Sequence, residues 1–297
     1  MRRSRLAIAK PHILTFFDNS LTKVFLTSDL EDILDEQGAI WNLPVSLTLN
    51  KFIQFLSEEG QLVVLRFKFL FQGTRMFEWG DASIYEIAMA IRPKGYLSHL
   101  SALRYHGFSD PPGDDEEKVI YVNDEQKEKP KGSGSLEQSR IDAAFKRPAR
   151  KSNNHVEVKG HTFYQLSGMH TNRLGVIEVP DPACPVPIRV AGHERSLIDA
   201  TVRPIYAGGP GTVLEGFRRA AGHVDAGAML TMLQELAFVY PYHQAIGFYL
   251  ERAGVYEANA LDLFRRLPRD FDFYLDYEME DPSYSSDWRL YYPGELD

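Results

Sequence analysis

The spacing of apolar side chains predicts three helices at the start of the chain. Residues 5–17 favour a helix that runs mostly from Pro11, because proline suits a first helical turn. A second helix is predicted from Thr27, where hydroxyl and acidic side chains suit a helix N-terminus, and Gly38 ends it. Apolar residues recur at helical spacing over residues 46–59, which predicts the third helix.

A β-hairpin is predicted directly after these helices. Residues 62–71 are rich in strand-forming side chains, and residues 74–79 return as a second strand after a turn at Gln72 and Gly73. Three helices followed by a hairpin is the order of a winged helix-turn-helix, in which the third helix enters the major groove of DNA and the hairpin is the wing. The same order occurs in protein-docking modules, so the pattern alone leaves both interpretations open.

The remaining sequence alternates strand and helix patterns and then becomes mostly helical. A second hairpin is predicted around Gly160, from residues 155–159 and 161–166. The other predicted elements are helices at 83–91 and 96–107, strands at 119–122 and 175–179, and helices at 193–200, 212–221, 225–237, 242–253 and 258–267.

Together these patterns predict an α+β protein of two domains. Residues 1–90 are expected to form the winged helix-turn-helix domain, and residues 91–297 a larger mixed α/β, mostly helical domain. Residues 123–152 are charged and contain a Gly-Ser run, which predicts a mobile basic insertion. A chain of 297 residues is long enough for two domains, and its 44% hydrophobic and 25% charged residues are ordinary for a globular protein.

Composition excludes several classes of protein. The single cysteine, Cys184, rules out an intramolecular disulfide and a cysteine-based zinc site. The basic N-terminus lacks the continuous apolar core of a signal peptide. No stretch approaches the ~20 apolar residues needed to cross a membrane. We therefore expect a cytoplasmic protein with no membrane partner.

The net charge of −8 is distributed unevenly. Residues 270–297 carry nine acidic side chains against Arg289 alone, whereas residues 126–151 carry eight bases and three acids. The acidic tail is also rich in aromatic residues, so we expect it to fold back on its domain rather than remain solvated. Residues 1–80 hold nine bases and nine acids, so their charge does not predict tight DNA binding by one copy.

Polar and basic side chains still mark a candidate DNA-contacting surface in the first domain. They come from a basic N-terminal arm, from the start of the third helix and from the hairpin, whereas Glu58 and Glu59 end that helix with charges that repel phosphate. The candidates are Arg2, Arg3, Arg5, Ser46, Thr48, Asn50, Lys51, Gln54, Arg66, Lys68 and Arg75.

Patterns that suggest catalysis are weak throughout the chain. The triplet Glu157-Val-Lys159 is similar to an acid-x-Lys element of metal-dependent nucleases, but a half-exposed strand produces such a triplet by its period of two. His99 and His106 are seven residues apart rather than the four of a helical metal-binding pair. Residues 208–211 lack the Gly-Lys-Ser/Thr ending of a phosphate-binding loop. We predict no catalytic residue, no metal, no cofactor and no enzymatic activity.

Three segments resemble the AbiEi family, the antitoxins of abortive-infection (type IV) toxin–antitoxin systems. They are residues 95–107 with the strand at 120–122, residues 194–209 and residues 240–254. The resemblance implies a winged helix-turn-helix that binds operator DNA, as inverted or direct repeats in the protein's own promoter, and represses the operon, with a homo-oligomer on DNA. It also implies that the larger region counteracts a nucleotidyltransferase-like toxin, functionally rather than in a stable complex.

Arg195, Asp199 and Arg203 are the candidate partner-binding residues. They are spaced four apart on one predicted helical face, a pattern that forms i,i+4 ion pairs. One interpretation is a structural network beneath the turn that follows, and the other is a contact surface for a partner. Two alternatives to the antitoxin function also stand at this point: a metal-dependent nuclease of a defence system, and a protein-interaction adaptor that binds no DNA.

Overall fold

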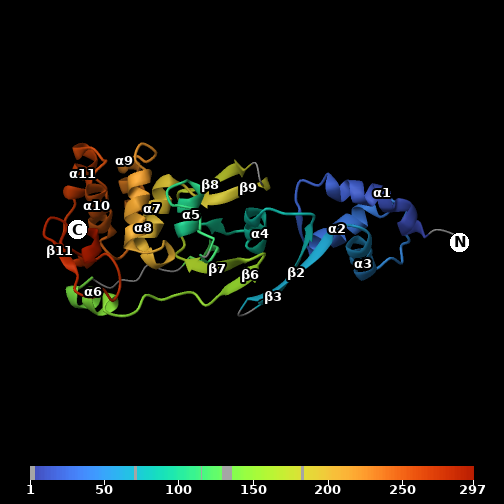
Figure 1. Ribbon diagram of the computed structural model, residues 1–297, viewed down its shortest axis with the longest axis horizontal. Helices are drawn as coiled ribbons and strands as arrows, with labels where there is room; N and C mark the ends of the chain where they lie inside the picture. The colour runs from blue at the N-terminus through green and yellow to red at the C-terminus, as the bar shows by residue number, and fades with distance from the viewer. Residues whose placement is uncertain (1–3, 70–71, 115, 129–135, 182–183) are drawn as a thin grey trace. The chain divides into compact units, whose positions relative to one another are not determined.

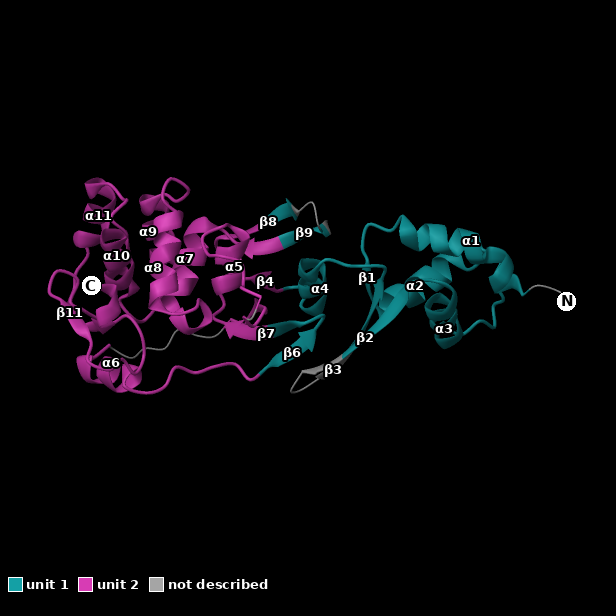
Figure 2. Cartoon of the chain, in the orientation of Figure 1, with its two compact units in different colours: residues 1–94, 154–163, 178–188 teal, residues 95–153, 164–177, 189–297 magenta. Residues whose placement is uncertain are grey.

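A computed structural model describes residues 4–69, 72–114, 116–128, 136–181 and 184–297. The described residues form a mixed α/β protein that divides into two compact units (Figures 1 and 2). Unit 1 comprises residues 1–94, 154–163 and 178–188, and unit 2 comprises residues 95–153, 164–177 and 189–297. No helix in the described part of the chain is long and apolar enough to cross a bilayer.

Unit 1 begins with α1 (Arg5–Asp18), β1 (Val24–Leu26), α2 (Thr27–Gln37) and α3 (Leu49–Glu59). The prediction that the first helix runs mostly from Pro11 is wrong, because Pro11 lies inside α1. The Ser4 hydroxyl accepts a hydrogen bond from the Ala7 N–H and so caps the helix before that point. Burial of Ile13 and Phe17 on one face of α1 outweighs the backbone hydrogen bond that proline removes.

The hairpin follows as β2 (Leu62–Phe69) and β3 (Gln72–Trp79). In the described residues, β1, β3 and β2 form an antiparallel sheet in that order. Gln72 pairs with Phe69 and Gly73 with Lys68, so the predicted turn residues belong to β3, and residues 70–71, which connect the strands, lie outside the described part. The strand register explains this difference from the prediction. The two strands stay paired from Leu62 and Trp79 as far as Phe69 and Gln72, so the predicted turn residues remain within the sheet.

The helices and the sheet of unit 1 enclose an aromatic core. The rings of Phe17 and Trp79 stack with centroids 4.9 Å apart, and the indole N–H of Trp79 donates to Asp18 at 2.8 Å. Unit 1 also contains α4 (Ile84–Ile91), capped by the Ser83 hydroxyl, and β6 (His155–Val158).

Strands β4 (Tyr96–Leu97), β5 (Val119–Glu125), β7 (His161–Gly168), β8 (Val176–Asp181) and β9 (Cys184–Ala191) complete the main sheet. Within the described residues its order is β6-β7-β5-β4-β9-β8, and β7, β8 and β9 contribute residues to both units. The hairpin predicted around Gly160 is confirmed, since Lys159 and Gly160 take left-handed φ angles of 51° and 72° in the turn.

Strand β9 was not predicted, because it begins within a proline-rich run that is typical of a loop. Its parallel pairing with β4 joins Val190 to Leu97, beyond those prolines. Cys184, at its start, is buried and has a free thiol.

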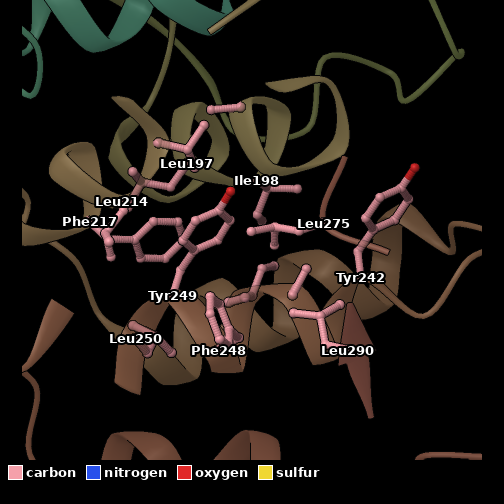
Figure 3. Close-up of a cluster of buried hydrophobic side chains, with 14 of the residues drawn as sticks. Leu197, Ile198, Leu214, Phe217, Tyr242, Phe248, Tyr249, Leu250, Leu275 and Leu290 are labelled. Carbon is pink, nitrogen blue, oxygen red and sulfur yellow. The ribbon is translucent and has the colours of Figure 1, made fainter. Parts of the chain in front are cut away.

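Unit 2 is mostly helical, and α10 lies at its centre. Phe217 and Tyr249 stack with ring centroids 5.1 Å apart, as part of a cluster that joins α10 to α7 and α8 (Figure 3). The helices of this unit are α5 (His99–Tyr105), α6 (Gln138–Phe145), α7 (His193–Val202), α8 (Pro210–Arg219), α9 (Ala226–Leu236), α10 (Tyr242–Ala253) and α11 (Ala258–Arg265).

The prediction of a mobile insertion over residues 123–152 is wrong for much of its described part. Strand β5 continues to Glu125, and α6 follows at residues 138–145. Ile141 and Phe145 of α6 are buried, and the Phe145 ring stacks on Tyr277 with centroids 4.5 Å apart. These contacts with a distant segment order the helix despite its charged neighbours, while residues 129–135 lie outside the described part.

The acidic tail folds onto unit 2, as its aromatic content predicted. It forms the short strands β10 (Phe273–Tyr274), β11 (Ser283–Ser285) and β12 (Leu290–Tyr292), with β12 paired to both others. Trp288 is fully buried against α10, and its indole N–H donates to Glu251 at 2.7 Å. The amide nitrogen of Gln244 donates to the Trp288 carbonyl at 2.7 Å.

Gly247→Ala is expected to destabilise unit 2, because a Cβ at this position would lie 2.1 Å from the Trp288 ring. Overpacking of a core typically costs ~1–3 kcal/mol, and urea unfolding followed by tryptophan fluorescence measures it. Gly211→Ala is the matched control, since this glycine of α8 has no atom within 4 Å of an added Cβ. The control is expected to raise stability by up to ~1 kcal/mol, because alanine favours the helix. Equal effects of the two substitutions would contradict the packing of the tail.

Candidate functional site

The start of α3 presents the predicted polar residues on an exposed surface. Phe52, Ile53 and Leu56 are buried in the core of unit 1, so the opposite side of the helix faces solvent. The Thr48 hydroxyl caps α3 by accepting a hydrogen bond from the Lys51 N–H. The exposed predicted residues here are Ser46, Thr48, Asn50, Lys51 and Gln54. All five therefore lie in the first half of α3 or directly before it.

The two acidic residues at the end of α3 are engaged by neighbouring side chains. Glu59 forms an ion pair with Lys10 of α1. Glu58 accepts a hydrogen bond from the Gln54 amide at 2.7 Å. The first contact partly neutralises the acidic end of the helix, while the second occupies one of the candidate DNA-contacting side chains.

The hairpin places two positive charges directly opposite each other. Arg66 of β2 and Arg75 of β3 are register partners, and both side chains are exposed. The Arg75 guanidinium also lies over the Phe77 ring, 4.7 Å from its centroid. Like charges directly opposite in an antiparallel pair destabilise it. An anion bound between the two arginines would relieve this repulsion.

The other predicted basic residues are placed less completely. Arg5 is exposed in the first turn of α1. The backbone of Lys68 pairs with Gly73, but its side chain lies outside the described part, as do Arg2 and Arg3.

In unit 2, Arg195 and Asp199 form a buried ion pair rather than a surface contact. Arg195 Nε lies 2.8 Å from Asp199 Oδ1, and the two residues are 3% and 6% exposed. The guanidinium also donates to the Tyr96 hydroxyl at 3.0 Å and to the Leu174 carbonyl. Arg195 thus joins α7 to β4 and to the loop before β8. Of the three predicted partner-binding residues, only Arg203 is exposed.

The candidate nuclease triplet contributes to a structural contact in unit 1. Lys159 Nζ lies 2.7 Å from Glu78 Oε1 and 2.6 Å from Asp81 Oδ1, which ties the β6–β7 turn to the end of β3. Glu157 is exposed. Among the residues that the structure describes, no group of three or more His, Cys, Asp and Glu side chains is placed to hold a metal ion.

The two histidines of α5 and its C-cap serve separate contacts. His99 Nδ1 lies 2.8 Å from the Ser98 hydroxyl, and its ring meets Tyr206 edge-on at 5.5 Å between centroids. His106 Nε2 lies 2.7 Å from the Ala191 carbonyl oxygen. Burial lowers the pKa of His99 to about 4, so its imidazole is neutral at physiological pH.

A cavity of ≈ 510 Å³ opens beside the Arg195–Asp199 pair, entirely within unit 2. Its lining includes His99 from α5, Asp199 from α7, Arg203 at the end of α7, and four tyrosines: Tyr206, Tyr240, Tyr242 and Tyr277. Asp199 Oδ2 is buried and has no hydrogen-bond partner among the described residues. The sequence pointed to Asp199 and Arg203 by their spacing, but not to the tyrosines, which come from distant segments.

Comparison with known proteins finds the fold but no family. No family model matches the sequence, and no curated protein matches it. The crystal structure of the RV2827C protein from Mycobacterium tuberculosis is similar over 98% of this chain and 93% of that one, with a TM-score of 0.57 and 15% sequence identity. The two proteins therefore share a fold along nearly their whole length.

Protonation of His99 is expected to destabilise the folded protein as the pH falls from about 6.5 to about 4. Burial lowers the pKa of His99 only in the folded state, so the unfolded chain takes up the proton first and stability is lost below pH 6.5. His99→Asn removes this contribution and keeps a residue that tolerates the left-handed φ of 51°.

Urea unfolding of the two proteins at successive pH values measures the effect. The stability of the native protein relative to the variant should fall by up to ~1.4 kcal/mol per pH unit in this window. Burial also lowers the pKa values of the half-buried His106 and His243, but these residues are present in both proteins, so their contribution cancels. A difference that stays constant with pH would contradict a neutral His99.

Proposed function

We propose that unit 1 contains a winged helix-turn-helix that binds DNA, with α3 in the major groove and the β2–β3 hairpin as the wing. The element order α1-β1-α2-α3-β2-β3 supports this assignment. So do the exposed polar residues at the start of α3, because amide, hydroxyl and amino groups there suit both base edges and phosphates.

The facing arginines of the hairpin are the observation that carries the proposal. Arg66 and Arg75 are exposed and directly opposite, an arrangement that costs stability in the free protein and is relieved by phosphate. Since residues 1–80 have balanced charges, one copy is expected to bind weakly. We therefore propose that two copies bind repeated half-sites in the protein's own promoter and repress its operon.

We further propose that the chain is an antitoxin of the AbiEi type that counteracts a nucleotidyltransferase-like toxin. The segments that carry the resemblance correspond to β4 and α5 with part of β5, to α7 with the turn after it, and to α10. Contacts of α7 with both α5 and α10 join these segments in one core, so the resemblance extends over a continuous part of unit 2. This function requires no catalytic residue, metal or cofactor, and both roles are carried out in the cytoplasm.

Replacing Arg66 and Arg75 by alanine together is expected to weaken DNA binding and reduce its salt dependence. Each lost phosphate contact lowers the slope of log affinity against log salt by about 0.9. Gel shifts with the operon's own promoter at several salt concentrations provide the measurement. Lys94→Ala, an exposed base elsewhere in unit 1, is the control and should change neither quantity.

Thermal unfolding of the double variant distinguishes lost contacts from lost folding. Removal of two facing like charges should leave the Tm unchanged or raise it. Unchanged affinity with an unchanged salt slope would exclude the hairpin as a wing, and absence of any salt-dependent binding by the native protein would favour the adaptor alternative.

The antitoxin proposal predicts that a neighbouring gene encodes a nucleotidyltransferase-like protein, and growth of cells that express this protein tests it. Co-expression of the native chain is expected to restore growth. The Arg66→Ala, Arg75→Ala variant should restore growth equally while losing repression of a promoter fusion, because the two roles are assigned to different units. Failure of the native chain to restore growth would overturn the antitoxin proposal and leave DNA binding to be judged separately.

A further inference from the structure

The cavity of unit 2 combines features of a small-molecule site that the proposed antitoxin role does not use. Its volume of ≈ 510 Å³ falls within the roughly 300–1,000 Å³ typical of ligand sites. Tyr206, Tyr240, Tyr242 and Tyr277 contribute aromatic surface to the lining, which also holds polar side chains such as Asn123, Gln126 and Thr171. Aromatic surface combined with polar groups that fix the orientation of a ligand is a usual form of such sites.

Asp199, which lines this cavity, has a buried carboxylate oxygen without a hydrogen-bond donor among the described residues. Its Oδ1 is bound to Arg195 at 2.8 Å, while its Oδ2 has no partner among the described residues. A buried carboxylate oxygen without a donor is costly, and native proteins usually satisfy such atoms. An N–H or O–H group of a ligand would satisfy this one.

Charge decides which donor suits the site. Asp199 is already neutralised by Arg195, and His99 is uncharged, so Arg203 provides the excess charge of the lining. This positive balance disfavours a cationic ligand such as an amine. It favours a ligand with a neutral N–H donor for Asp199 and an anionic group for Arg203.

Arg203 is positioned to bind that anionic group. It is exposed at the C-cap of α7, and its guanidinium has no ion-pair partner in the described part of the chain. Burial raises the pKa of Tyr277 and the charge of Arg203 opposes this change, which is consistent with a guanidinium near that hydroxyl. Arginine binds phosphate through paired N–H groups.

Contacts of two of the tyrosines hold the walls of the cavity in place. The Tyr206 hydroxyl accepts a hydrogen bond from the Ser152 N–H at 2.8 Å and donates to the Arg150 carbonyl at 3.2 Å. Tyr277 is held by its stacking on Phe145 of α6. Aromatic side chains held in this way provide a surface on which a flat ring can stack.

From this geometry we infer that the cavity binds a mononucleotide. A base N–H donates to Asp199 Oδ2, the base packs against the tyrosines, and the phosphate binds Arg203. This inference goes beyond the DNA-binding and antitoxin roles and does not depend on them.

Calorimetric titration of the full chain with AMP, GMP, CMP and UMP in turn tests the inference. At least one is expected to bind saturably at concentrations up to about 1 mM, the range of weak specific binding. The corresponding nucleoside should bind about tenfold more weakly than the mononucleotide, because it lacks the phosphate. Inorganic phosphate alone should show no saturable binding, since it has no ring to stack and no N–H for Asp199.

Two arginine variants locate the site. Arg203→Ala is expected to weaken the mononucleotide about tenfold, as expected for loss of a charged phosphate contact. Arg266→Ala is the matched control, because Arg266 is also an exposed C-cap residue but does not line the cavity. Thermal unfolding confirms that both variants fold.

Asp199→Asn tests the base contact, since the amide changes which base is preferred. If loss of the charge beside Arg195 prevents folding, the comparison of Arg203→Ala with Arg266→Ala decides the question alone. No saturable binding of any mononucleotide, or equal weakening by the two arginine variants, would overturn the inference. The DNA gel shifts would be unaffected by either result, so the two proposals fail independently.

Discussion

Burial of α10 along most of its surface is the constraint on which unit 2 depends. A helix buried on nearly every side requires cover from several elements, and α7, α8 and α11 supply only part of it. The acidic tail provides the rest, with the Trp288 ring seated where Gly247 leaves room. Gln244 fixes the tail by donating to its backbone carbonyls. The last segment of the chain is therefore part of the core, and its acidic residues mostly remain outside.

The fold of unit 2 also depends on the buried ion pair between Arg195 and Asp199. Burying two charges costs desolvation energy that their attraction offsets only when geometry and further hydrogen bonds are good. Arg195 meets this condition by donating to Tyr96 and Leu174 as well as to Asp199. Asp199 meets it only in part, because one of its oxygens is buried without a donor among the described residues. The Arg195 guanidinium thus has hydrogen-bond partners in both helix and sheet, whereas one carboxylate oxygen of Asp199 has none among the described residues.

Local patterns predicted the elements that local forces determine. The helix at 242–253 has the predicted bounds because Gly254 ends it with a left-handed cap, and the Gly160 hairpin was identified from its turn glycine. Helix α6 was missed because its order depends on Tyr277, more than a hundred residues later. Strand β9 was missed because it contains Pro185 and Pro187, and proline is typical of loops rather than of strands.

The candidate sites also differ in how far local sequence patterns predict them. The exposed start of α3 follows from an amphipathic pattern within one helix, so its polar residues were named in advance. The pairing of Arg195 with Asp199 follows equally from their i,i+4 spacing. The cavity could not be predicted from local spacing. Its lining comes from α5, α7 and the segments around Tyr240 and Tyr277, which are distant in the sequence and meet only in the folded chain.

The facing arginines of the hairpin give unit 1 opposite responses to ionic strength. Added salt screens the repulsion between Arg66 and Arg75, so it strengthens the free hairpin. The same salt weakens any complex with a polyanion, because counterions released into a more concentrated solution gain less entropy. Low ionic strength thus leaves the hairpin least stable alone and most responsive to phosphate. In such a hairpin, stability and affinity cannot both be greatest under one set of conditions.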